Sequence, residues 1–91
     1  MVSFAGLQMQ DGIPIYLQIV RHLKAGIVAG TVACGEEMPS RRVLSALLGV
    51  NPNTVQKAYR LLEDSGVIAS HTGAKSFVCA GEDTIARIRA Q

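Results

Sequence analysis

The middle of the chain carries side chains whose chemistry suits the surface of duplex DNA. Between residues 39 and 62 the charged side chains are all basic, and they are Arg41, Arg42, Lys57 and Arg60. Guanidinium and ammonium groups bind phosphates, whereas amides such as those of Asn53 and Gln56 can bond to base edges. The pattern therefore predicts one positive, DNA-binding face. Charge alone also fits an ordinary solvated helix face, because the net charge of the chain is only +2.

The first element expected to support this face is a long helix over residues 14–29. Its apolar residues recur at helical spacing at Ile15, Ile19, Leu23 and Ile27. Pro14 suits the first helical position, and Gly30 stands where a helix commonly ends in a glycine. Residues 1–13 have no strong periodicity and are interpreted as an arm that leads into this helix.

Two short helices are predicted across the basic region itself. Ser40 can cap a helix over residues 40–48, whose expected apolar stripe is Val43, Leu44, Leu47 and Leu48. Asn51 can cap a helix over residues 52–65, because Pro52 suits its first position. The apolar residues predicted to face one way on this helix are Val55, Ala58, Tyr59 and Leu62. Two short helices joined by a tight, glycine-containing turn form a helix-turn-helix pattern.

A small β-hairpin and the start of another helix are predicted after this pair. Residues 67–71 and 76–79 have strand character and flank a loop that contains Gly73. The fold class expected is therefore mainly α with a small β-hairpin, a winged helix-turn-helix. We divide the chain into an N-terminal arm (1–13), the winged helix-turn-helix DNA-binding domain (14–80) and the start of a C-terminal linker or dimerisation helix (81–91).

Several other classes of protein are disfavoured by what the sequence lacks. No Ser/His/Asp set, paired carboxylates or metal-ligand cluster emerges, so we expect no enzyme activity, no metal and no cofactor. Cys34 and Cys79 are interpreted as reduced thiols, buried or neutral, because neither belongs to a CxxC motif. No segment is long and apolar enough to span a membrane, and no secretory signal is recognised, so a cytoplasmic location is expected.

The chain resembles the GntR family of bacterial transcriptional regulators. The matching stretches are residues 14–19 (PIYLQI), 38–44 (MPSRRVL), 48–59 (LGVNPNTVQKAY) and 61–63 (LLE), with Gly66 and then residues 73–78. Each motif is weak alone, but their order and spacing together are specific. The Asn-Pro-Asn-Thr-Val turn at residue 51 resembles the YtrA-like branch, which has a short helical dimerisation segment after the DNA-binding domain.

The resemblance implies a sequence-specific repressor that binds an inverted-repeat operator in double-stranded DNA as a homodimer, through a C-terminal segment largely absent here. It places the helix over residues 52–65 in the major groove and the hairpin wing at the minor groove. The resemblance indicates Arg42, Asn51, Asn53, Thr54, Gln56, Thr72 and Gly73 as DNA-binding residues. To these we add Ser40, Arg41, Lys57 and Lys75 as DNA-binding candidates. Pro52 stands where many members carry a base-reading Arg, and Lys75 stands where the wing pattern has Gly. The base specificity of other members therefore does not transfer.

These residues are expected to differ in role. Arg42 is the strongest candidate anchor, while Arg41 lies where the family often has an acid. Gln56 is expected to touch bases; Asn53 either does so or only helps the helix start, and Asn51 fits a cap better than a reader. A winged helix used for protein–protein contact is the alternative, and it would lack a positive face.

Overall fold

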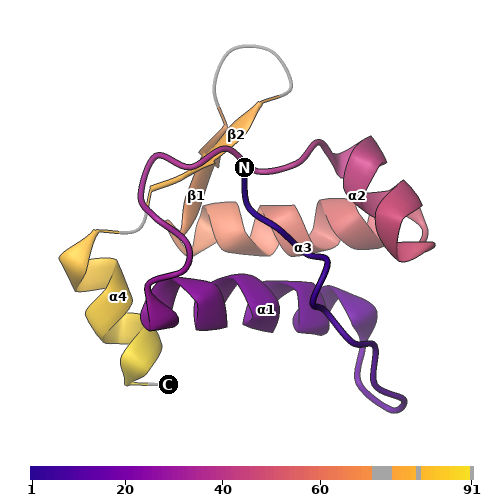
Figure 1. Cartoon of the computed structure of the whole chain (residues 1–91), viewed down its shortest axis with the longest axis horizontal. Coiled ribbons are helices and arrows are strands. Elements are labelled where there is room, and N and C mark those ends of the chain that lie inside the picture. The colour runs from indigo at the N-terminus through magenta and orange to yellow at the C-terminus, as the bar shows by residue number, and fades with distance from the viewer. Residues whose placement is uncertain (71–74, 80, 91) are drawn as a thin grey trace.

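The computed structural model describes residues 1–70, 75–79 and 81–90 of the chain. Its elements are α1 (Ile15–Ala29), α2 (Arg41–Leu48), α3 (Pro52–Asp64), β1 (Ile68–Ser70), β2 (Ser76–Val78) and α4 (Glu82–Arg89). Their order, helices first and then a hairpin, is the winged helix-turn-helix layout that the sequence predicts (Figure 1). Residues 72–74 of the predicted turn of the wing, and residue 71 of the predicted strand before it, lie outside the described residues.

The helix boundaries follow from the capping residues. The Ser40 side chain accepts a hydrogen bond from the Val43 backbone N–H at 3.1 Å, which fixes the start of α2. The Asn51 side chain accepts from the Asn53 N–H at 2.8 Å and fixes the start of α3. Gly49 ends α2 with a φ of 68°, a conformation that favours glycine. Local chemistry therefore determines the helix-turn-helix.

The hairpin is supported by a third extended segment that precedes α2. β1 and β2 pair antiparallel, with Ile68 opposite Val78. The Met38 N–H donates to the Ser76 carbonyl at 2.8 Å, and the Val78 N–H donates to the Glu36 carbonyl at 2.8 Å. A two-stranded hairpin alone is marginally stable, so this extra edge helps to hold the wing against the helices.

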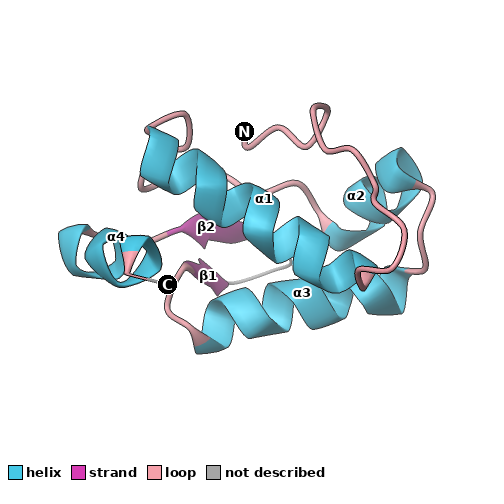
Figure 2. Ribbon diagram, turned by 90° about the horizontal axis from the view of Figure 1, so that it is seen from below, coloured by secondary structure: helices cyan, strands magenta, loops and turns pink. Residues whose placement is uncertain are grey.

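The core lies between α1, α3 and the base of the hairpin. Figure 2 shows α1 and α3 running side by side, with α4 at one end of the domain, where it contacts α1. The side chains with no exposed surface include Ile19, Leu23, Leu44, Val55, Ala58, Tyr59 and Leu62. Every residue predicted to be buried on α3 belongs to this set, so the helical phase inferred from the sequence is confirmed.

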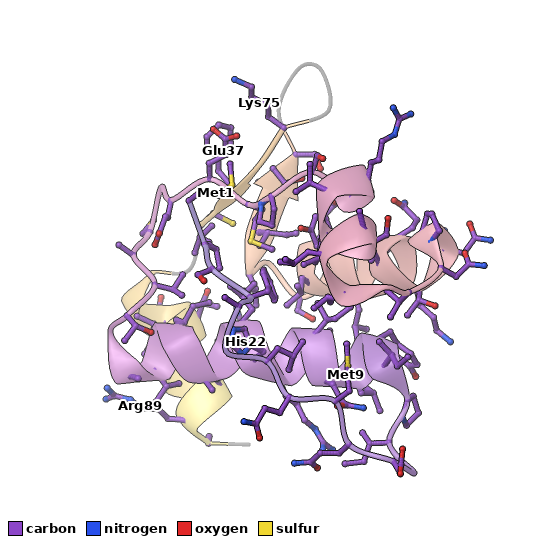
Figure 3. All side chains as sticks on the ribbon, turned by 45° about the vertical axis from the view of Figure 1, so that its right-hand side comes forward. Met1, Met9, His22, Glu37, Lys75 and Arg89 are labelled. Atoms are coloured by element: carbon purple, nitrogen blue, oxygen red, sulfur yellow. The ribbon has the colours of Figure 1, made fainter. Side chains whose placement is uncertain are left out.

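The N-terminal segment completes the core and does more than lead into α1. Val2 and Phe4 are buried, and the Val2 N–H donates to the Glu37 carbonyl at 2.9 Å. The Phe4 and His22 rings lie 5.1 Å apart, and His22 Nε2 lies 3.0 Å from the Ser3 carbonyl oxygen. Figure 3 shows His22 on α1 beside this segment. The sequence did not predict this packing.

The apolar stripe predicted for α2 is half wrong. Leu44 is buried and Leu48 is partly buried, but Val43 is 57% exposed and Leu47 is 60% exposed. Each residue turns the helix by about 100°, so a short helix that buries Leu44 and Ser45 must turn Val43 and Leu47 outward. Apolar surface therefore remains on α2.

One further expectation needs correction. Both thiols, Cys34 and Cys79, are free and exposed, so the buried alternative is wrong. In α4, Ile88 is buried against the same chain and Ile85 is partly buried, so this helix packs on the domain. Among the described residues, no helix has the length and apolarity needed to cross a bilayer.

Candidate nucleic-acid interface

The exposed face of α3 carries the predicted base-reading amides. Asn53 and Gln56 are exposed, as is the neighbouring Lys57. Their exposure follows from the helical phase, because Val55 and Tyr59 point into the core. The amide groups can therefore approach another molecule without any rearrangement of the helix.

The capping residues of α2 and α3 already have structural hydrogen bonds. The Ser40 hydroxyl oxygen accepts from Val43, but its O–H remains able to donate to a phosphate. Oδ1 of the Asn51 side chain accepts a hydrogen bond from the Asn53 backbone N–H, which fits the interpretation of Asn51 as a cap. Thr54 follows in the first turn of α3 and is half-buried.

The two adjacent arginines separate in the structure. Arg42 is exposed in the first turn of α2. Arg41 turns inward, where its Nη2 donates to Glu63 Oε1 at 2.9 Å and its guanidinium lies 5.0 Å from the centroid of the Tyr59 ring. Arg42 is therefore available to a phosphate, whereas Arg41 is engaged within the fold.

The remaining basic candidates are Lys57 on α3 and Lys75 directly before β2. Lys57 Nζ lies 4.1 Å from the centroid of the Tyr16 ring, a cation–π contact that links α3 to α1. Lys75 is exposed directly before β2, at the end of the hairpin that adjoins residues 71–74, and projects away from the helices (Figure 3). Thr72 and Gly73, the predicted wing-tip contacts, lie outside the described residues.

The sequence analysis missed the polar contacts of Glu63 and Tyr59. The Ser70 hydroxyl donates to Glu63 Oε1 at 2.8 Å, so one carboxylate oxygen receives both Ser70 and Arg41. Tyr59 O–H donates to the Pro39 carbonyl at 2.6 Å. The Arg41–Glu63 pair could not be inferred from the sequence, because 22 residues separate its members.

Sequence and structure comparisons decide the family. A profile described as "Bacterial regulatory proteins, gntR family" matches residues 15–78, most of the chain. The chain belongs to the GntR family. It is 37% identical over 71 residues to the HTH-type transcriptional repressor YtrA of Bacillus subtilis, an alignment that covers 78% of this chain and 55% of YtrA. The chain thus spans about half the length of this curated relative.

Solved GntR structures share the fold. A GntR family transcriptional regulator from Listeria monocytogenes matches with a TM-score of 0.80 and 34% identity, over 90% of this chain and 72% of that one. YtrA from Sulfolobus acidocaldarius matches with a TM-score of 0.75 and 30% identity, over 92% and 73% of the two chains. This GntR protein is therefore a DNA-binding transcriptional regulator and not an enzyme. In the described part of the chain, no group of three His, Cys, Asp or Glu residues could hold a metal ion.

Tyr59→Phe is expected to destabilise this GntR domain by about 1–3 kcal/mol, because it leaves the buried Pro39 carbonyl without its donor. Burial raises the pKa of Tyr59 above its ordinary value, and the nearby Arg41 only partly opposes this shift. A raised pKa stabilises the fold below the unfolded-state value of about 10, and that stability is lost as the pH rises further. Urea denaturation at pH 7 and above pH 10 measures both effects.

Tyr16→Phe is the matched control, because Tyr16 is only half-buried on α1. It is expected to have a smaller effect at both pH values. Equal stability of the Tyr59→Phe variant and the wild type at pH 7 would show that the hydrogen bond to Pro39 adds nothing.

Proposed function

We propose that this GntR regulator is a cytoplasmic repressor that binds an inverted-repeat operator as a homodimer. The observation that carries the proposal is the exposure of Asn53 and Gln56 on α3, together with the exposed cations Arg42 on α2 and Lys75 beside β2. Amides suited to base edges thus accompany charges suited to phosphates, the two kinds of contact that a sequence-specific DNA-binding surface requires. The similarity to YtrA, a transcriptional repressor, supports repression as against activation.

The proposed reader is the N-terminal half of α3, placed in the major groove. Asn and Gln side chains can each form two hydrogen bonds with adenine there. Gln56 is exposed in the second turn of α3, whereas the exposed Asn53 lies in the first turn. Pro52 precedes both of them and lacks any polar group able to read a base. The amides would therefore supply the base selectivity.

The proposed anchors surround this reader. Arg42 and the Ser40 hydroxyl would bond phosphates from the start of α2, and Thr54 would do so from the start of α3. Lys57 can leave the Tyr16 ring for a phosphate, because a surface cation–π contact is worth only about 0.5–1 kcal/mol. Lys75, with Thr72 and Gly73 of the wing, would engage the minor groove or its backbone.

Dimerisation is proposed because one winged helix contacts only a few base pairs, which gives little discrimination among genomic sites. A two-fold axis doubles the contacts and makes the site an inverted repeat. We propose that the second copy attaches through the C-terminal segment that α4 begins. Ala25 and Val28 of α1 and Ile88 of α4 line an open, mostly apolar groove beside this segment.

Gln56→Ala and Arg42→Ala are expected to have different effects on DNA binding. Loss of a bidentate base contact by Gln56 should remove about 1–3 kcal/mol of discrimination at one base pair of each half-site. Loss of Arg42 should weaken binding to all sequences. It should also make the slope of log K against log salt shallower by the contribution of about one phosphate contact per copy. Competition titrations with duplexes substituted at single base pairs measure both quantities.

Arg21→Ala is the control for Arg42, because Arg21 is an exposed arginine on α1 and lines pockets that contain no α3 residue. It removes the same charge and should change affinity little. Since Arg21 also borders the groove proposed for the second copy, sedimentation of this variant must show the wild-type oligomeric state. Unchanged affinity and base preference in the Gln56→Ala variant would mean that α3 does not present this residue to bases.

A further inference from the structure

A chain of polar contacts joins the helix-turn-helix to the wing. Arg41 of α2 donates to Glu63 of α3 at 2.9 Å, and Ser70 of β1 donates to the same Oε1 at 2.8 Å. Ser70 Oγ also lies 3.3 Å from the hydroxyl oxygen of the buried Ser76 on β2. One carboxylate thus connects α2 and α3 with both strands of the hairpin.

The Arg41 side chain is held too firmly to serve as a mobile surface cation. Its side chain is 28% exposed and that of Glu63 is 32% exposed. Arg41 Nε is buried and has no hydrogen-bond partner among the described residues, while the guanidinium packs over the Tyr59 ring. An ion pair shielded in this way keeps more of its strength than a fully exposed one.

We propose that Arg41 and Glu63 are positioning residues for DNA binding, which hold the wing at a fixed angle to α3. The proposal rests on the proposed function, because α3 and the wing must reach the duplex together. It replaces the expectation that Arg41 contacts a phosphate. The role is indirect, since the pair acts through the placement of Lys75 and the α3 amides.

This role predicts that removal of the Glu63 carboxylate changes the DNA affinity in the opposite direction to the one expected from charge alone. Removal of an acid from a DNA-binding surface ordinarily strengthens binding, because the phosphates repel carboxylates. If Glu63 positions the wing, Glu63→Ala should weaken binding despite the gain of one positive charge per copy. A loosely held wing must be ordered on binding, which lowers the affinity.

Asp64→Ala is the matched control for Glu63→Ala. Asp64 is the next residue of α3, it is exposed, and no ion pair joins it to another described residue. Both substitutions remove one negative charge at the same helix end and introduce the same helix-forming residue. Only Glu63 contacts Arg41 and Ser70. The difference between the two variants therefore isolates the network from the charge.

The test measures affinity for a duplex enriched from a random pool by the wild-type chain, at several salt concentrations. Glu63→Ala is expected to bind about tenfold more weakly than Asp64→Ala. Ser70→Ala should show a smaller loss, and it serves as the second variant if Glu63→Ala does not fold. Arg41→Ala should weaken binding without changing its salt dependence. The double variant Arg41→Ala/Glu63→Ala should bind no more weakly than the weaker-binding of the two single variants, because both substitutions break the same contact. Hydrogen exchange at β1 and β2 of the free protein should accelerate in Glu63→Ala and not in Asp64→Ala.

The outcomes separate the two proposals. Equal affinity and equal hairpin exchange in Glu63→Ala and Asp64→Ala, with a wild type that binds, would overturn the positioning role alone. If Arg41→Ala makes the slope of log K against log salt shallower by about one phosphate contact per copy, Arg41 contacts a phosphate directly. A wild-type chain that enriches no duplex would overturn the proposed function, and the positioning role with it.

Discussion

Phe4→Ala is expected to lower the free energy of unfolding by about 3–5 kcal/mol, the usual range for loss of a buried aromatic side chain. Phe4 is only 2% exposed and packs against His22 of α1. Its loss would leave a cavity under the N-terminal segment and weaken the contact that holds this segment on the domain. A small domain is stabilised by only about 5–15 kcal/mol in total, so the change removes a large share.

Urea denaturation followed by circular dichroism measures this loss. Met9→Ala is the control, because Met9 belongs to the same segment but is 41% exposed. It should change the midpoint little. If Phe4→Ala unfolds at the wild-type urea concentration, the N-terminal segment does not belong to the core, and the domain begins near α1.

Affinity for duplex DNA is expected to fall about a thousandfold between about 50 and 200 mM salt, if two copies each neutralise about three phosphates. The exposed cations proposed for these contacts are Arg42, Lys57 and Lys75. Each neutralised phosphate contributes about −0.9 to the slope of log K against log salt, so six contacts give a slope of about −5. Arg41 is left out of the count because it is paired with Glu63.

Fluorescence anisotropy of a labelled duplex at four or more salt concentrations measures the slope. A slope of about −3 would indicate that a single copy occupies the DNA. Salt-independent binding, or no binding at low salt, would contradict the contribution of these cations. A single-stranded probe of the same length controls for attraction to phosphates alone.

The helix-turn-helix was predictable because its determinants are local. Ser40 and Asn51 cap the helices at which they stand, and the buried face of α3 follows from the spacing of its apolar residues. The family motifs cover the same stretch. Exposure of Asn53 and Gln56 then follows from helical phase alone, which is why the candidate reading face could be located without a structure.

The features that sequence analysis missed depend on contacts between distant segments. Val2 and Phe4 lie in a segment without periodicity, and their burial depends on the surface that α1 offers. The outward position of Leu47 depends on how α2 sits against α3. The Arg41–Glu63 pair forms only when α2 and the end of α3 meet, so charge along the chain did not reveal it.

Selection of bound duplexes from a random-sequence pool tests the central claim most directly. Sequence-specific binding by a two-fold dimer predicts an enriched inverted repeat, with half-sites whose centres lie about one helical turn or a multiple of it apart. Wild-type selection should retain this repeat after competition with unlabelled random duplex. A pool that remains random after repeated rounds would contradict sequence-specific recognition by this protein.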